Sequence, residues 1–83
     1  MNYQLIILKK AQKDLQKLEP RHRLRVLAAL IVIRQDPFSG KPLMGEWKGT
    51  WSYRVWPYRI LYEIYSDQLL IHVVKIGHRQ GVY

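Results

Sequence analysis

The chain has 83 residues, 48% of them hydrophobic, and fourteen Lys and Arg against six Asp and Glu give it a formal net charge of +8. The hydrophobic content excludes a disordered protein, and a chain of this length has room for one core, so we expect a single domain over residues 1–83. The absence of cysteine excludes disulfides and a thiolate nucleophile, and three scattered histidines argue against a zinc site, so we expect no metal.

The first predicted element is a strand over residues 3–8, YQLIIL, because this run is short, apolar and partly β-branched. The lysines follow the apolar run instead of preceding it, and no stretch approaches the ~20 apolar residues that span a bilayer. We therefore expect no signal peptide, no membrane partner and a cytoplasmic protein.

Two helices are predicted next. Leucine and alanine recur at helical spacing between the lysines of KKAQKDLQKLE, residues 9–19, and Pro20 interrupts this pattern before a second helix within residues 21–35. The very short connection predicts an antiparallel helical hairpin.

The second of these helices carries two apolar stripes. They consist of Leu24, Leu27, Ala28 and Ile31 on one side and Val26, Leu30 and Ile33 on the other. A helix that is apolar on two sides needs cover on more than one side. Either the sheet and the first helix bury both stripes, or part of the helix docks a second protein chain.

Residues 36–49 hold proline, glycine and serine in turn positions and are predicted to form a loop. Strands are predicted over residues 50–56, 58–65 and 69–76, with a hairpin turn at residues 66–68. The resulting order is β-α-α-β-β-β. It predicts an α+β fold in which a small, mainly antiparallel sheet carries the helical hairpin on one face.

Side-chain alternation predicts which residues share a face of this sheet. In residues 58–65, Tyr58, Ile60, Tyr62 and Ile64 point toward the core, and Arg59, Leu61, Glu63 and Tyr65 point the other way. Arg54, Trp56 and Arg59 then fall together on the open side. Arginine and aromatic side chains on an open sheet suit RNA, although surface arginines also commonly pair with acids such as Glu63 or remain in water.

Two longer segments, PLMGEWKGTWSYRVWPYRILYEI and LLIHVVKIGHRQGVY, together resemble the RelE/ParE superfamily of bacterial and archaeal toxins, specifically its RelE-like branch. The matching positions are Leu43, Gly45, Gly49, Arg54, Val55, Tyr58, Arg59, Ile60, Tyr62, Gly77, His78, Arg79 and Tyr83.

The resemblance implies the toxin of a type II toxin–antitoxin pair, namely a ribosome-dependent endoribonuclease that cuts mRNA in the A site without a metal or other cofactor. Its partners would be the ribosome, mRNA and an acidic, amphipathic RelB-like antitoxin, with which such toxins form heterotetramers. In the implied reaction, the RNA 2′-OH attacks the adjacent phosphate.

The resemblance also implies roles for individual residues. Arg59 matches the arginine that binds the scissile phosphate, Arg79 matches a phosphate-stabilising arginine, and Tyr83 matches a tyrosine that stacks on a base or acts as the general base. A tyrosine base needs nearby cations to lower its pKa, and the two arginines could supply them.

Four further residues are predicted to contact RNA: Lys48, Arg54, Trp56 and His78. His78 is also the alternative base, because an unperturbed imidazole titrates near neutrality, although its position next to Arg79 slightly favours a structural role, since adjacent residues tend to point apart.

The sequence departs from the RelE-like pattern at two places. Ser52 stands where a basic residue is frequent, and Trp56-Pro57 replaces Gly-Asp at the hairpin. Two alternatives therefore stay open: a ParE-like inhibitor of DNA gyrase, and a basic RNA-binding module without catalysis. Codon preference and the identity of the antitoxin are not contained in the sequence.

Overall fold

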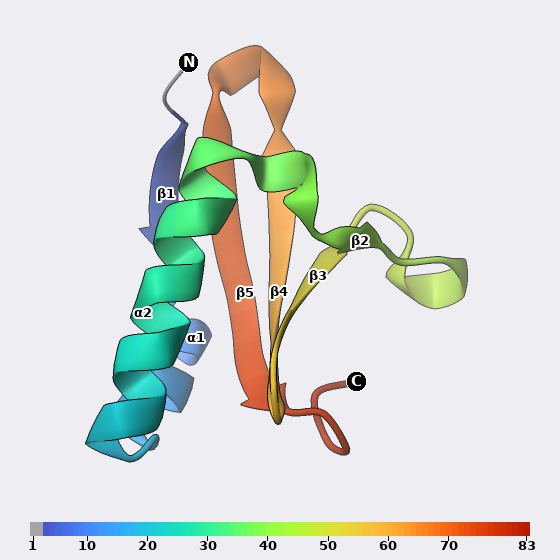
Figure 1. Ribbon diagram of the computed structural model, residues 1–83. Helices are drawn as coiled ribbons and strands as arrows, with labels where there is room; N and C mark the ends of the chain where they lie inside the picture. Colours follow the sequence, from blue (N-terminus) through green and yellow to red (C-terminus); the bar gives the residue numbers. More distant parts are fainter. Residues whose placement is uncertain (1–2) are drawn as a thin grey trace.

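Five strands form one sheet, in the order β1-β5-β4-β3-β2, in a computed structural model that describes residues 3–83 (Figure 1). The central strand β4 (Tyr58–Tyr65) lies antiparallel between β3 (Trp51–Val55) and β5 (Leu70–His78). Strand β1 (Gln4–Ile7) lies parallel to β5 at one edge. The predicted mainly antiparallel sheet is therefore confirmed.

The opposite edge of the sheet is very short. Strand β2 (Lys41–Pro42) has two residues and pairs only with Ser52 and Trp51 of β3. The sequence predicted a loop for this stretch, because proline is poor at strand pairing and the strand is too short to show alternation. Beyond Ser52, the outer edge of β3 has no strand beside it within the described residues.

The two helices form the predicted hairpin on one face of the sheet (Figure 1). Helix α1 (Lys9–Gln16) packs against β5, and α2 (Pro20–Gln35) packs against β3. Helix α1 ends earlier than predicted. Pro20 opens α2 at its first turn instead of lying before it, because proline has no N–H to lose there and its fixed φ suits a helix start.

Only one of the two apolar stripes of α2 faces the core. Val26, Leu30 and Ile33 are buried with Ile60, Tyr62, Ile71 and Val73 of the sheet. The other stripe is open, with Leu24 67% exposed and Ile31 60% exposed. Burying every apolar side chain of α2 would need cover that the sheet and α1 do not provide, so this stripe is available to a partner.

Residues 36–49 form an ordered connection with two short 3₁₀ turns, Pro37–Ser39 and Gly45–Trp47. Gly45 and Gly49 adopt φ of 68° and 98°, a region that glycine enters without steric cost. The Tyr62 hydroxyl anchors the connection by donating a hydrogen bond of 2.7 Å to the Pro37 carbonyl. Burial raises the pKa of Tyr62 to about 12.

No helix within residues 3–83 has the length and apolar character needed to cross a membrane.

Candidate nucleic-acid interface

The face of the sheet that turns away from the helices carries two arginines side by side. Arg54 on β3 is paired in register with Arg59 on β4, and Arg59 is paired with Gly77 on β5. Their sequence neighbours Val55 and Ile60 are buried in the core, so alternation directs both arginines to the open face. The sequence predicted this arrangement of the two arginines, but Trp56, which was predicted beside them, lies after the end of β3 and lines a hollow next to α2.

Neither arginine is neutralised by a carboxylate. The ion pairs in residues 3–83 are Lys10–Asp14 and Arg21–Glu19, both on the helices. Glu63, the acid that could have paired with these arginines, instead accepts a hydrogen bond of 2.9 Å from the Tyr65 hydroxyl. That bond raises the pKa of Tyr65. Like charges directly opposite on neighbouring strands destabilise a sheet, and an anion between them would remove that cost.

A hollow of about 310 Å³ lies beside the two arginines. Its lining residues are Ser39, Gly40, Lys41, Ser52, Tyr53, Arg54 and Arg59. Lys41 was not predicted, because its place on the open face depends on the pairing of the unpredicted strand β2 with Ser52 of β3.

Lys75 was also missed, and a β-bulge explains why. Leu61 pairs with Lys75 and Tyr62 pairs with Val73, so Val74 is an extra residue in β5. Strict alternation would place Lys75 on the same side as the buried Val73, but the extra residue shifts the pattern, and Ile76 enters the core instead. Lys75 therefore faces the open side next to Leu61.

The tail, residues 78–83, folds back over this open face. The Arg79 amide donates to the Pro57 carbonyl at 2.8 Å, and the Gly81 amide donates to the His78 carbonyl at 2.9 Å, which turns the chain. Val82 is then fully buried against Gly77. A Cβ on Gly77 would lie 3.3 Å from the Val82 side chain, so glycine provides the space in which Val82 packs.

Leu61 lies on the open face, as alternation predicts, yet its side chain is fully buried. It does not belong to the cluster under the helices. The open face therefore has a small apolar region of its own, formed where the tail, through Val82, lies on the strands.

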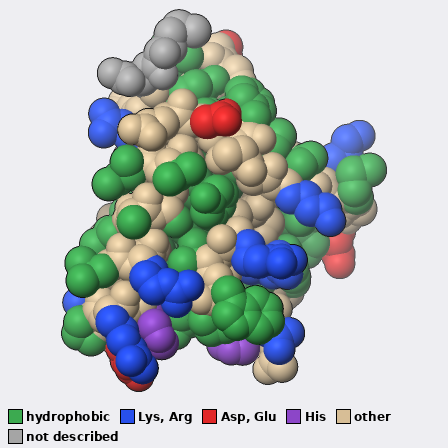
Figure 2. Space-filling model, viewed as in Figure 1, with side chains coloured by type: hydrophobic (Ala, Val, Ile, Leu, Met, Phe, Trp, Pro, Cys, Tyr) green, Lys and Arg blue, Asp and Glu red, His purple; other side chains and the backbone are tan. Residues whose placement is uncertain are grey.

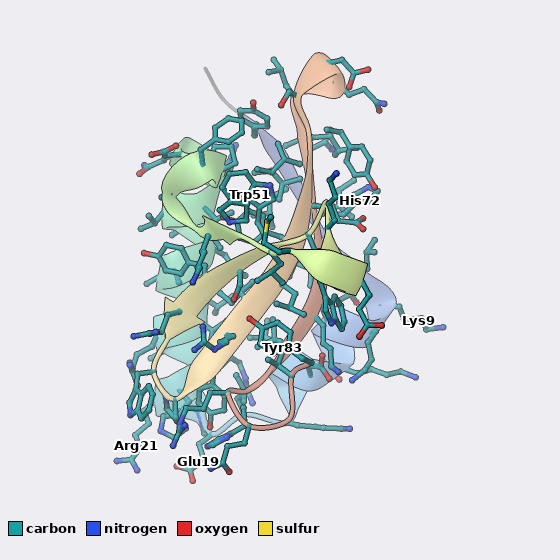
Figure 3. All side chains as sticks on the ribbon, turned by 90° about the vertical axis from the view of Figure 1, so that its right-hand side faces the viewer. Lys9, Glu19, Arg21, Trp51, His72 and Tyr83 are labelled. Carbon is teal, nitrogen blue, oxygen red and sulfur yellow. The ribbon has the colours of Figure 1, made fainter. Side chains whose placement is uncertain are left out.

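Tyr83 is placed by this folded tail. Its hydroxyl donates to Ser52 Oγ at 3.3 Å, and its ring meets the Trp47 ring edge-on with centroids 5.8 Å apart. Figure 3 shows Tyr83 near the centre of the view, turned back from the end of the chain toward the strands. Ser52, the departure from the RelE-like pattern, thus holds the tyrosine hydroxyl beside the arginine pair.

Arg79 lies at the β3–β4 turn. Its guanidinium carbon is 4.5 Å from the centroid of the Trp56 ring, a cation–π contact. The Trp56-Pro57 peptide bond is cis, and Trp56 remains 54% exposed. The second departure from the family pattern therefore supplies the surface on which Arg79 rests.

His78 and Lys48 lie at the borders of this region. His78 is exposed at the end of β5; its Nδ1 accepts a hydrogen bond of 3.3 Å from the Gln80 amide, and its ring lies 6.1 Å from that of Tyr58. Lys48 is exposed and follows Trp47, the residue that contacts Tyr83. Within residues 3–83, no three His, Asp or Glu side chains come together as metal ligands would.

The chain is similar to known toxins in sequence and in fold. The family model described as "ParE toxin of type II toxin-antitoxin system, parDE" matches residues 5–83. The chain is 35% identical over 79 residues to toxin RelG of Mycobacterium tuberculosis, covering 88% of this chain and 86% of that one.

Two solved toxin–antitoxin complexes contain a similar chain. The RelBE2 complex of M. tuberculosis matches with 32% identity and a TM-score of 0.89, over 95% of this chain and all of the other. The archaeal RelE–RelB complex of Pyrococcus horikoshii matches with 24% identity and a TM-score of 0.83, over 99% of this chain and all of the other, which shows a shared fold.

Proposed function

From membership in the RelE/ParE superfamily of type II toxins, to which this chain belongs, we propose that it is an endoribonuclease that cuts translated mRNA in the ribosomal A site. The observation that carries the proposal is the unneutralised pair Arg54–Arg59 beside a tyrosine hydroxyl at Ser52. A cationic pair next to a potential proton acceptor matches what cleavage of a phosphodiester requires.

In the proposed reaction, the RNA 2′-oxygen forms a bond to the adjacent phosphorus, and the bond from phosphorus to the 5′-oxygen breaks. The products are a 2′,3′-cyclic phosphate and a 5′-hydroxyl. A base takes the proton of the 2′-OH, and an acid returns a proton to the leaving oxygen. Cations stabilise the extra negative charge that develops on the phosphorane.

Arg59 and Arg54 bind the scissile phosphate and its transition-state charge, because they are adjacent and face the hollow at Ser52. Tyr83 acts there as base or as a stacking surface, since its hydroxyl is bonded at the same hollow. Arg79 rests on Trp56 outside this hollow, so its part in the proposal is to add positive charge along the path of the RNA; arginine acts through charge because it does not give up its proton near neutrality. His78, turned toward Tyr58 and Gln80, contacts RNA without acting as the base.

The proposed partner is a RelB-like antitoxin, and the chain offers it a second surface. A groove of about 520 Å³ lies between β1 and α2, lined largely by apolar side chains such as Leu5, Ile7 and Leu27, with Arg34 at its border. The open stripe of α2 continues from it. An acidic, amphipathic segment fits this surface and the net charge, and two such pairs would assemble as a heterotetramer.

In vitro translation of a defined mRNA tests the proposal. Cleavage sites are mapped by primer extension, with and without ribosomes, for the wild type and for Arg59→Ala and Tyr83→Phe. Ribosome-dependent cuts that disappear with Arg59→Ala support the endonuclease. Intact mRNA with wild-type toxin rejects it.

A second candidate function is inhibition of DNA gyrase, because the matching family model is that of the ParE toxins. A supercoiling assay with the same variants distinguishes the two. A gyrase inhibitor has no need of the Arg54, Arg59 and Tyr83 arrangement, so its activity would survive Arg59→Ala.

A further inference from the structure

A second hollow, of about 390 Å³, lies between α2 and the part of β3 that β2 leaves uncovered. Its apolar lining consists of Ala28, Ala29, Val32 and Val55, and its other lining residues are Arg25, Tyr53, Arg54 and Trp56. Figure 2 shows basic side chains on either side of hydrophobic ones in this region, between α2 and β3.

The two arginines of this hollow hold different positions. Arg25 extends from α2 across the groove and donates a hydrogen bond of 2.7 Å to the Trp56 carbonyl, which leaves its other N–H groups available. Tyr53 and Arg54 line both this hollow and the one beside Arg59, so the two hollows adjoin at these two residues of β3. A chain of phosphates could therefore pass from one to the other around the edge of β3.

Trp56 offers a stacking surface at the same place. The Arg79 guanidinium covers part of the ring, at 4.5 Å, yet Trp56 is 54% exposed and lines the groove. A nucleobase stacked on the indole would lie near the small side chains of Ala28 and Val32, which leave room for a flat ring. Stacking of a base on an aromatic side chain is sequence-tolerant and needs no hydrogen-bond readout.

We propose that the groove between α2 and the free edge of β3 is a nucleotide subsite for single-stranded RNA, in which Trp56 stacks a base and Arg25 and Arg54 bind its flanking phosphates. The subsite rests on the proposed function, since it extends the same RNA past the cleavage position. It differs from the apolar groove at β1, which has one arginine among aliphatic side chains and suits a peptide helix.

Binding of an uncleavable RNA tests the subsite separately from catalysis. Labelled 2′-O-methyl oligonucleotides of two to eight residues are titrated with the toxin, purified and freed from its antitoxin, and followed by fluorescence anisotropy. Arg25→Glu is compared with Arg21→Glu, which makes the same charge change on the same helix at an exposed residue outside the groove. Ala28→Phe, which fills the groove, is compared with Leu24→Phe at an exposed position.

Arg25→Glu and Ala28→Phe are expected to weaken binding of the longer oligonucleotides about tenfold, and the two controls less than about threefold. The slope of the logarithm of the RNA affinity against the logarithm of the salt concentration should become shallower by about one in Arg25→Glu, because one phosphate contact is lost. Dinucleotide binding stays unchanged, because the Arg54–Arg59 hollow is intact. In the translation assay, Arg25→Glu raises KM and leaves kcat unchanged.

The subsite would be overturned if Arg25→Glu and Arg21→Glu lost the same amount of RNA affinity, or if the wild type did not bind RNA. So would variants that weaken antitoxin binding and leave RNA binding unchanged, because the groove would then belong to the antitoxin. If the wild type binds RNA through the groove but cuts no mRNA, the endonuclease fails and the RNA subsite stands. Thermal unfolding of each variant verifies that it is folded.

Discussion

The two faces of the sheet follow opposite rules. On the face under the helices, Ile60, Tyr62 and Val73 are fully buried and form one cluster with α2. On the open face, Arg54 and Arg59 lie side by side without an acid, and apolar burial is confined to the region where Val82 meets the strands. One face is arranged for packing, and the other keeps a repulsive pair of charges that packing alone would not favour.

The difference between the two faces indicates that the residues that stabilise the fold and the residues proposed to bind RNA are different ones, although they lie on the same strands. Neighbouring residues of β4 point to opposite faces, so Arg59 and Ile60 are adjacent in sequence and differ in what they do. Substitutions on the open face should change activity with little effect on unfolding, and substitutions under the helices should do the reverse.

Arg59→Ala is expected to have the largest effect. It should lower ribosome-dependent cleavage by about 10²–10³-fold, the range for removing one preorganised group that stabilises transition-state charge. Its free energy of unfolding should stay unchanged or rise slightly, because the repulsion from Arg54 is relieved. Primer extension and urea unfolding measure the two quantities. A loss of stability that matches the loss of activity would contradict the separation of the faces.

Gly40→Ala should destabilise the protein by about 3 kcal/mol, at the upper end of overpacking costs. The added Cβ would lie 2.3 Å from the Tyr62 hydroxyl oxygen and 2.9 Å from the Ser52 carbonyl oxygen, and the second atom belongs to the backbone and cannot move easily. Denaturant unfolding measures the change. Gly81→Ala, which meets nothing within 4 Å, is the control and should be close to neutral.

Tyr62 should make the fold sensitive to alkali. Its pKa is raised from 10.0 to about 12 in the folded state, so the stabilisation is fully present below pH 10 and is lost as the pH rises toward 12. A difference of about two units between the folded and unfolded pKa corresponds to at most about 2.7 kcal/mol of the free energy of unfolding. In Tyr62→Phe, stability at neutral pH falls by about 1 kcal/mol with the lost hydrogen bond, and the additional alkaline loss becomes smaller. If the free energy of unfolding fell equally steeply with alkaline pH in the wild type and in Tyr62→Phe, Tyr62 would not titrate in this way.

Val82→Ala tests the apolar region of the open face and is expected to lower the free energy of unfolding by only about 1 kcal/mol. Cleavage should nevertheless fall about tenfold, because a loosened tail no longer holds the Tyr83 hydroxyl at Ser52, and misplacement of about 1 Å can cost 10²-fold. Val82→Ile, which keeps the contact with Gly77, is the matched variant. Full activity of Val82→Ala would show that the tail is held by other contacts.

Alternation along β3 and β4 was enough to predict the open face and its arginines, because both strands are regular in this part. Alternation alone does not describe β5, where one extra residue at Val74 places Lys75 on the open side. A bulge leaves no mark in a run of aliphatic residues, so the sequence held no signal for it.

The tail illustrates a second limit. Its residues were predicted to matter because they resemble a family motif, but their arrangement depends on tertiary contacts. The packing of Val82 on Gly77 and of Arg79 on Trp56 joins residues from different elements, and neither pattern nor propensity reports such contacts. For α2, the sequence revealed two apolar stripes, and only the packed structure distinguished the buried one from the open one.

The parallel pairing of β1 with β5 has a consequence for how the molecule is made. The Gln4 amide donates a hydrogen bond to the Leu69 carbonyl, and β1 pairs in register with Leu70–Val73, so β1 depends on a segment that is synthesised much later. Such long-range pairing closes slowly. The sheet therefore cannot be completed before β5 has been synthesised, because β1 and β4 both pair with it. A chain that stops short of β5 is expected to lack the folded arginine face.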